Sequence, residues 1–116
     1  MKRGEIWTLQ DDRYASKARP VVILQEDLAD ASDSVILTLF TTFNNAAVGS
    51  RVAVEPSKTN GLKHTSFVMA EKLLTVRRTE LGVRIGTLTD DQMHDISRKL
   101  AHVLGITAAD LPTSPR

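Results

Sequence analysis

Six short runs of apolar and β-branched residues, separated by turn-forming residues, are spread along the chain before residue 78. Runs of this length and composition are typical of β-strands, and the Gly, Asn, Pro and Ser residues between them favour turns. The pattern predicts a mainly β fold in which a small antiparallel sheet curls into a barrel-like shape. The runs span residues 6–9, 21–24, 35–40, 52–54, 66–69 and 73–76.

One amphipathic helix is predicted after the strands, over residues 90–104. Thr89 and Gln92 have the spacing of a capping box, and two acidic residues lie between them, at the positive end of the helix dipole. Apolar residues then recur at helical spacing, and Gly105 can adopt the left-handed conformation that ends a helix. We therefore expect this helix to pack on the sheet, and a shorter helical turn around residues 78–81.

The length and composition indicate one compact domain. The chain has 116 residues and 12.8 kDa, with 41% hydrophobic and 25% charged residues. We expect a single domain over residues 1–106 and a short tail over residues 107–116, which has little to bury. The absence of cysteine excludes disulfides and thiol chemistry and favours an intracellular protein. No signal peptide or membrane-spanning stretch is recognisable, so we expect a cytoplasmic protein that does not bind membranes.

The positions of the charged residues along the chain are more informative than the net charge. The formal net charge is only +1, but residues 51–78 hold six bases and two acids. This segment predicts a basic side of the molecule, of the kind that binds nucleic acid through its phosphates. The alternative is an ordinary solvated surface of mixed sign, because neighbours in sequence need not share one face.

Several enzyme classes are excluded by the motifs that the chain lacks. It contains no phosphate-binding glycine motif, no Gly-x-Ser-x-Gly and no His-Glu-x-x-His. His94 and His102 lie eight residues apart on the predicted helix, too far along its axis to share a metal ion, and we expect no metal or cofactor. The remaining Arg, Thr, Ser, Glu and Lys residues suit a phosphodiester reaction in which RNA supplies its own 2′-hydroxyl as nucleophile.

Several motifs follow one another along nearly the whole chain. They are Met-Lys-Arg-Gly-Glu-Ile-Trp at residues 1–7, Arg-Pro and a hydrophobic strand at 19–24, Phe-Thr-Thr at 40–42, Gly-Leu at 61–62 and Ile-Gly at 85–86. In this order they resemble the MazF/PemK family of toxin endoribonucleases. The resemblance implies a homodimer that binds single-stranded RNA along its groove and cleaves it, without metal, at short sequence motifs. It also implies a cognate antitoxin partner and a role in inhibiting translation and growth.

The same resemblance implies roles for individual residues. Arg19 matches the arginine that stabilises the phosphorane and can donate a proton, and Thr41 matches a residue that hydrogen-bonds the scissile phosphate. Thr42 is a substitute for Thr41, and Glu71 lies where members carry an acid for substrate contact or base function. These assignments make Arg19, Thr41 and Glu71 the predicted catalytic residues. The predicted RNA-binding residues are Lys17, Thr42, Arg51, Ser66 and Lys72.

The sequence also departs from the family pattern. Residues 11–18 are shorter than the usual loop and have different chemistry, Lys72 replaces a glutamine, and Met69 occupies the place of a catalytic arginine in one branch. That branch's acid–base pair therefore cannot be transferred to this chain. For Glu71 the ordinary alternative is an ion pair with a neighbouring base: Lys72, Arg77 or Arg78.

The aromatic residues fall into two groups. We expect Trp7 and Phe40 to fill the core, since both belong to predicted strands. Tyr14 and Phe43 adjoin predicted loops and are the candidates for stacking on an unpaired base.

Two other functions remain open at this point. The first is a non-catalytic inhibitor of DNA gyrase, because toxins of the CcdB type share the fold; such a binder would depend on exposed apolar residues near its C-terminal end. No aromatic anchor occurs there. The second is a small barrel that binds RNA without cutting it. Cleavage requires Arg19 and Thr41 near one phosphate, whereas neither alternative does.

Overall fold

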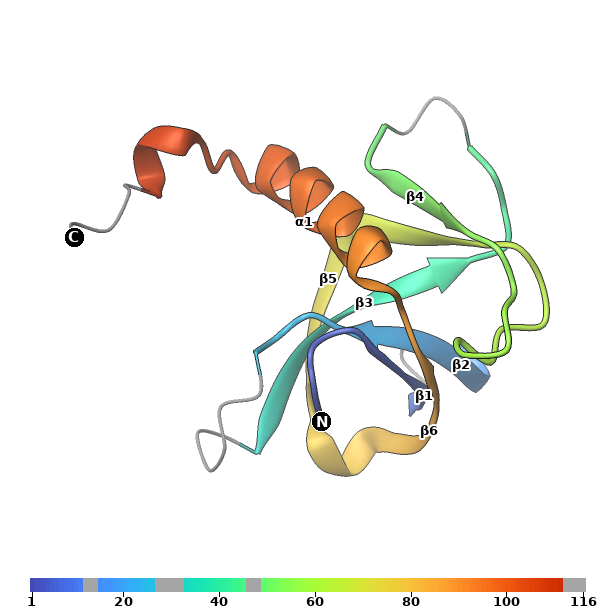
Figure 1. Ribbon diagram of the computed structural model, residues 1–116. Coiled ribbons are helices and arrows are strands. Elements are labelled where there is room, and N and C mark those ends of the chain that lie inside the picture. Colours follow the sequence, from blue (N-terminus) through green and yellow to red (C-terminus); the bar gives the residue numbers. More distant parts are fainter. Residues whose placement is uncertain (12–14, 27–32, 46–48, 112–116) are drawn as a thin grey trace.

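The computed structural model describes residues 1–11, 15–26, 33–45 and 49–111. The chain forms a strongly curled sheet crossed on one face by a helix (Figure 1). A 3-10 turn joins the last two strands, and a second follows the helix. The elements in chain order are β1 (Glu5–Asp11), β2 (Ala15–Ile23), β3 (Ser34–Thr41), β4 (Arg51–Val54), β5 (Ser66–Arg77), η1 (Arg78–Glu80), β6 (Leu81–Thr87), α1 (Asp90–Leu104) and η2 (Ala108–Asp110).

The six strands form one antiparallel sheet in the order β4-β5-β3-β2-β1-β6. Every neighbouring pair is antiparallel, which confirms the predicted fold class. Within the described residues the two outer strands, β4 and β6, do not pair with each other, so the sheet curls but does not close into a barrel.

The strand pattern differs from the sequence prediction in three places. Strand β2 begins at Ala15, so residues 15–18, predicted as part of a loop, belong to a strand. Residues 66–69 and 73–76 belong to a single strand, β5, whose pairing with β3 contains an irregularity. Strand β6 was not predicted, because its glycines interrupt the pattern of apolar and β-branched residues from which a strand is recognised. Gly86 is needed there for packing: a Cβ would lie 2.4 Å from the carbonyl carbon of Asn60. The loop that contains Asn60 thus fits tightly against β6.

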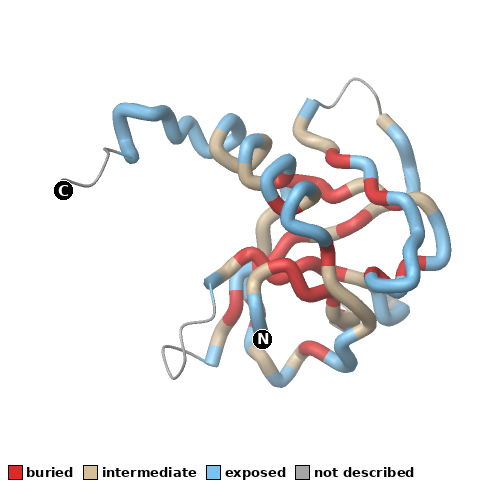
Figure 2. The backbone as a smooth tube through the Cα atoms, in the orientation of Figure 1, coloured by how far each residue is buried: buried red, intermediate tan, exposed pale blue. Residues whose placement is uncertain are grey.

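Two apolar cores lie on opposite faces of the curled sheet. The first lies under α1 and includes Met93 and Ile96 of the helix with Val68 of β5. The second lies on the other face and includes Val21 and Leu37. Figure 2 shows the buried residues concentrated in the sheet, while the end of α1 that leads away from it is largely exposed.

Both aromatic residues predicted for the core are found there. Phe40 is buried in the core under α1. Trp7 is half-buried against the opposite core, and its indole N–H donates to the Glu5 carboxylate at 3.0 Å. A polar partner for the indole is expected when a tryptophan is removed from water.

The boundaries of α1 are those predicted from the sequence. The backbone N–H of Gln92 donates to the Thr89 hydroxyl at 3.1 Å, and the backbone N–H of Thr89 donates to the Gln92 side chain at 2.9 Å. Gly105 ends the helix in the left-handed region, with φ of +73°. The turn predicted near residues 78–81 is η1. No helix in the described ranges is both long and apolar enough to span a membrane.

Candidate functional site

Arg19 and Thr41 each lie two residues beyond the paired part of β2 and β3. The pairing of these strands ends with Val21 opposite Leu39, and Arg19 pairs with Leu9 of β1. Side chains alternate along a strand, so both residues project on the face of Val21, which is the face opposite α1. Arg19 is exposed, and Pro20 restricts its backbone to an extended conformation. This geometry leaves a guanidinium and a hydroxyl on one open surface.

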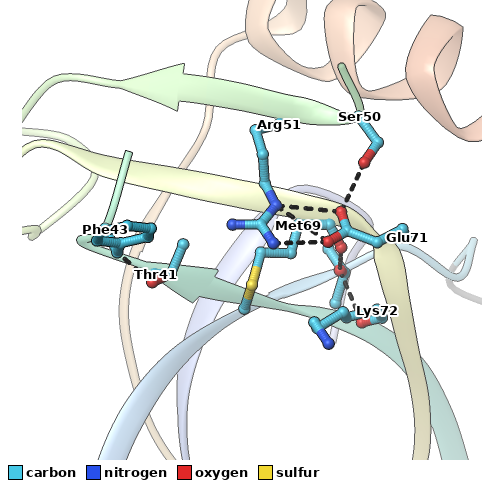
Figure 3. A network of polar contacts seen from close by, with 8 residues as sticks. Thr41, Phe43, Ser50, Arg51, Met69, Glu71 and Lys72 are labelled. Carbon is cyan, nitrogen blue, oxygen red and sulfur yellow. Dashed lines mark hydrogen bonds and ion pairs between the residues drawn. The ribbon is translucent and has the colours of Figure 1, made fainter. Parts of the chain in front are cut away.

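The hydroxyl of Thr41 is oriented by the chain that follows it. Its oxygen accepts the backbone N–H of Phe43 at 3.1 Å, a local turn that ends β3 (Figure 3). Because the oxygen is the acceptor in this bond, the O–H remains able to donate to a ligand oxygen. Phe43 itself is 69% exposed, so its ring is available for stacking. Tyr14, the other predicted stacking residue, lies outside the described residues.

A fixed ion pair between β4 and β5 forms a second polar cluster on this face. The Arg51 guanidinium donates to Glu71 through Nε at 3.0 Å and Nη2 at 2.8 Å, while the Ser50 hydroxyl donates to Glu71 at 2.7 Å (Figure 3). Burial alone would raise the pKa of the Glu71 carboxyl, but the hydrogen bonds from Arg51 and Ser50 outweigh it and lower the pKa to about 2. Glu71 is therefore a fully ionised hydrogen-bond acceptor at neutral pH.

The observed partner of Glu71 corrects the alternative considered from the sequence. That alternative paired it with Lys72, Arg77 or Arg78, all close in the chain, whereas its ion pair is with Arg51 on the adjacent strand. The pairing follows from register, because Arg51 lies opposite Met69, two residues from Glu71.

The part of β5 that carries Glu71 lies at an irregularity in the pairing with β3. The pairing with β3 jumps between Thr38 and Phe40, which leaves residues of β5 outside the regular ladder. The buried hydroxyl of Thr38 lies 2.5 Å from the carbonyl oxygen of Met69 and 3.0 Å from that of Lys72. Thr38 and Ser50 thus support the cluster, and sequence reasoning missed both, because neither belongs to a recognisable motif.

Other predicted RNA-binding residues line a separate pocket. Thr42 and Ser66, with Pro20 and His64, border a mostly apolar cavity of about 390 Å³. Ser66 is buried, and its hydroxyl donates to the carbonyl oxygen of His64 at 2.9 Å. Arg19, Thr41, Arg51 and Glu71 are not among the residues that line it.

The two predicted lysines are both exposed. Lys17 precedes Arg19 on β2, and Lys72 follows Glu71 on β5. The predicted site residues therefore fall into three groups: Arg19 with Thr41, the ion pair of Arg51 with Glu71, and the residues that line the pocket.

Within the described residues, no group of three or more His, Asp or Glu side chains is placed to hold a metal ion.

Comparisons with known proteins agree on one family. The family model described as "PemK-like, MazF-like toxin of type II toxin-antitoxin system" matches residues 2–104. A protein of Mycolicibacterium smegmatis named "Probable endoribonuclease MazF" is 39% identical over 107 residues, which cover 91% of this chain and 98% of that protein.

Solved structures of the same group share the fold. A mycobacterial structure titled "Endoribonuclease in complex with its cognate antitoxin" superposes with a TM-score of 0.78 at 26% identity, covering 92% of this chain and 97% of that one. The Mycobacterium tuberculosis toxin MazF-mt6 superposes with a TM-score of 0.76, also at 26% identity, covering 89% and 98%.

Proposed function

Because this chain belongs to the PemK-like, MazF-like toxins of type II toxin–antitoxin systems, we propose that it is a toxin that cleaves single-stranded RNA. The supporting observation is that Arg19 and Thr41 both lie on the face opposite α1, each two residues beyond the last β2–β3 pair, Val21 with Leu39. A phosphodiester bound there would meet a cation and a hydroxyl donor together. The family match and the endoribonuclease names of the relatives favour this function over gyrase inhibition and over RNA binding without cleavage.

The proposed reaction uses a nucleophile that RNA already carries. The 2′-hydroxyl gives up its proton to water and attacks the adjacent phosphorus, the bond to the 5′-oxygen breaks, the 5′-oxygen takes up a proton, and the products carry a 2′,3′-cyclic phosphate and a 5′-hydroxyl. Arg19 stabilises the charge that develops on the phosphorane oxygens and is the candidate to protonate the leaving oxygen. Thr41 donates its O–H to a non-bridging oxygen. No step requires a metal ion.

Glu71 has a different role in this proposal from the base function that the family resemblance allows. Its carboxylate already accepts hydrogen bonds from Arg51 and Ser50, and a pKa of about 2 makes it a weak base at neutral pH. We therefore assign to Glu71 the positioning of Arg51, which with Lys17 and Lys72 contacts the RNA backbone. Thr42 and Ser66 border the adjoining cavity.

The proposal extends to partners. The mycobacterial relative crystallised with its cognate antitoxin supports an antitoxin that restrains this chain, and the resemblance supports a homodimer. Cleavage of cellular RNA by such a toxin would take place in the cytoplasm.

The test is to incubate the purified protein with a long single-stranded RNA in excess chelator and to map the cut sites and their end groups. Discrete cuts with 5′-hydroxyl and 2′,3′-cyclic or 3′-phosphate ends are expected. Intact RNA from a folded sample, or activity that only a divalent metal restores, would refute the proposed reaction. The folded Arg19→Ala variant is the control for a contaminating ribonuclease.

A further inference from the structure

A groove separates the start of β4 from the helix α1. Its volume is about 840 Å³, more than twice that of the pocket beside Thr42. Figure 1 shows α1 running alongside β4 at this place. One wall is formed by Ser50, Arg51 and Val52, and the other by Asp95, Arg98, Lys99 and His102. We call this the α1–β4 groove.

The groove is lined by more positive than negative side chains. Arg51, Arg98 and Lys99 outnumber Asp95, its one acidic lining residue. Arg98 pairs with Asp95, but both side chains are largely exposed, at 71% and 53%, and such a surface pair is weak enough to exchange for another anion. Lys99 has no hydrogen-bond or ion-pair partner among the described residues. Along α1 the groove can therefore offer two cations, Arg98 and Lys99, to an anionic ligand.

Arg51 links the groove to the proposed cleavage site. Glu71 holds its guanidinium through Nε and Nη2, and Nη1 makes no hydrogen bond to any described residue. Strand pairing places Ala53, Phe67 and Thr41 in one row across β4, β5 and β3, with Arg51 two residues further along β4. By strand spacing, the Cα atoms of Arg51 and Thr41 are about 12 Å apart. The backbone of a short stretch of RNA can span this separation.

We propose that the α1–β4 groove binds backbone phosphates of single-stranded RNA outside the cleavage site, with Arg51 at its entrance and Arg98 and Lys99 along α1. This inference rests on the proposed RNA cleavage and extends its substrate site. Phosphate contacts are salt-dependent and insensitive to sequence, so the groove adds affinity for longer RNA rather than base selectivity.

The chemistry of the walls favours RNA over a protein segment. Protein interfaces depend on buried aromatic or aliphatic anchors, but among the described residues that line the groove only Val52 is aliphatic, and it is already buried in the core. The exposed apolar residues near the end of the helix, Leu104 and Ile106, are not among the residues lining the groove. Arginine and lysine with few apolar contacts suit a phosphate backbone.

Binding can be measured separately from cleavage with 2′-O-methyl RNA, which lacks the attacking hydroxyl. The Kd of a fluorescent oligonucleotide of about 20 nucleotides and of one of about 6 is determined by anisotropy over a series of salt concentrations. The test variant is Arg98→Gln with Lys99→Gln. The matched control is Lys2→Gln with Lys58→Gln, which removes the same charge at two exposed positions that do not line the groove.

For the groove variant, the slope of log affinity against log salt should fall in magnitude by about 0.7 for each lost phosphate contact. The Kd of the long oligonucleotide should rise more than that of the short one. The control should keep the wild-type slope, and thermal unfolding should show both variants folded. An unchanged slope in the groove variant, or an equal change in the control, overturns the proposal.

Two further results distinguish RNA binding in the groove from binding of an acidic protein segment and from the proposed cleavage. If the groove variant loses binding to poly-L-glutamate but keeps its affinity for RNA, the groove binds an acidic protein segment and the RNA proposal is overturned. If wild-type protein binds the long 2′-O-methyl RNA through the groove but cuts no natural RNA, the proposed cleavage fails while the phosphate site stands.

Discussion

The two faces of the sheet use the same strands for different purposes. On the face under α1, Val22, Phe40 and Val68 are buried in the core. On the opposite face, at the ends of the same strands, Arg19 and Thr41 are left outside the core. Because alternate side chains project to opposite faces, a strand can supply stability from one residue and chemistry from the next. Substitutions on the two faces should therefore have separable effects.

The largest difference between the effect on activity and the effect on stability is expected from Arg19→Ala. Loss of the guanidinium should lower the cleavage rate by about 1000-fold or more, because the other cations of the proposed site, Lys17, Arg51 and Lys72, are assigned to the RNA backbone and not to the phosphorane. The thermal unfolding midpoint should stay near that of the wild type, since Arg19 is exposed. Initial rates on a mapped RNA site, with calorimetry on the same samples, test both statements. Cleavage at the wild-type rate by the folded variant would show that Arg19 is not a catalytic residue.

Ile96→Ala tests the opposite face. Ile96 is fully buried on the side of α1 that packs on the sheet, so its truncation should cost about 2–5 kcal/mol of unfolding free energy, measured by urea denaturation. Activity per folded molecule should be unchanged at low temperature. A folded variant with specific activity reduced as strongly as in Arg19→Ala would show that the two faces are coupled.

Thr41→Ala is expected to have the next largest effect on catalysis. It removes one oriented hydrogen-bond donor and should slow cleavage by about 100-fold, while Thr41→Ser should keep most of the activity. Single-turnover rates distinguish a loss in the chemical step from weaker binding. If Thr41→Ala cleaves at the wild-type rate, Thr42 is the candidate for the role.

Glu71→Gln should have the smallest effect, and that effect should depend on pH. The folded-state pKa of about 2 is below the ordinary value of 4.5, so the carboxylate stabilises the fold above about pH 4.5 and loses this contribution as pH falls toward 2. The difference in unfolding free energy between wild type and Glu71→Gln should shrink over that interval.

The pH–rate profile gives a second readout for Glu71→Gln. Its shape near neutrality should match that of the wild type, because a carboxylate with this pKa does not titrate there. If the wild-type rate falls at low pH and this acidic limb is lost in the variant, Glu71 is instead the general base.

Much of the architecture followed from local sequence patterns. The helix over residues 90–104 was predicted with its boundaries, because the Thr89–Gln92 capping box and Gly105 act within a few residues of chain. The β class and the core positions of Trp7 and Phe40 followed from apolar runs. The family resemblance, which the match to residues 2–104 confirms, singled out Arg19 and Thr41.

Other features depend on residues far apart in the chain. The continuity of β5 requires its pairing with β3 and the hydroxyl of Thr38, and the ion pair of Glu71 with Arg51 requires the β4–β5 register. Strand β6 needs the loop that packs against Gly86. Local patterns determined which segments became helix or strand, because capping and side-chain periodicity act over short distances. Tertiary structure decided which strands pair and which charges meet, because those contacts form only when the chain has folded.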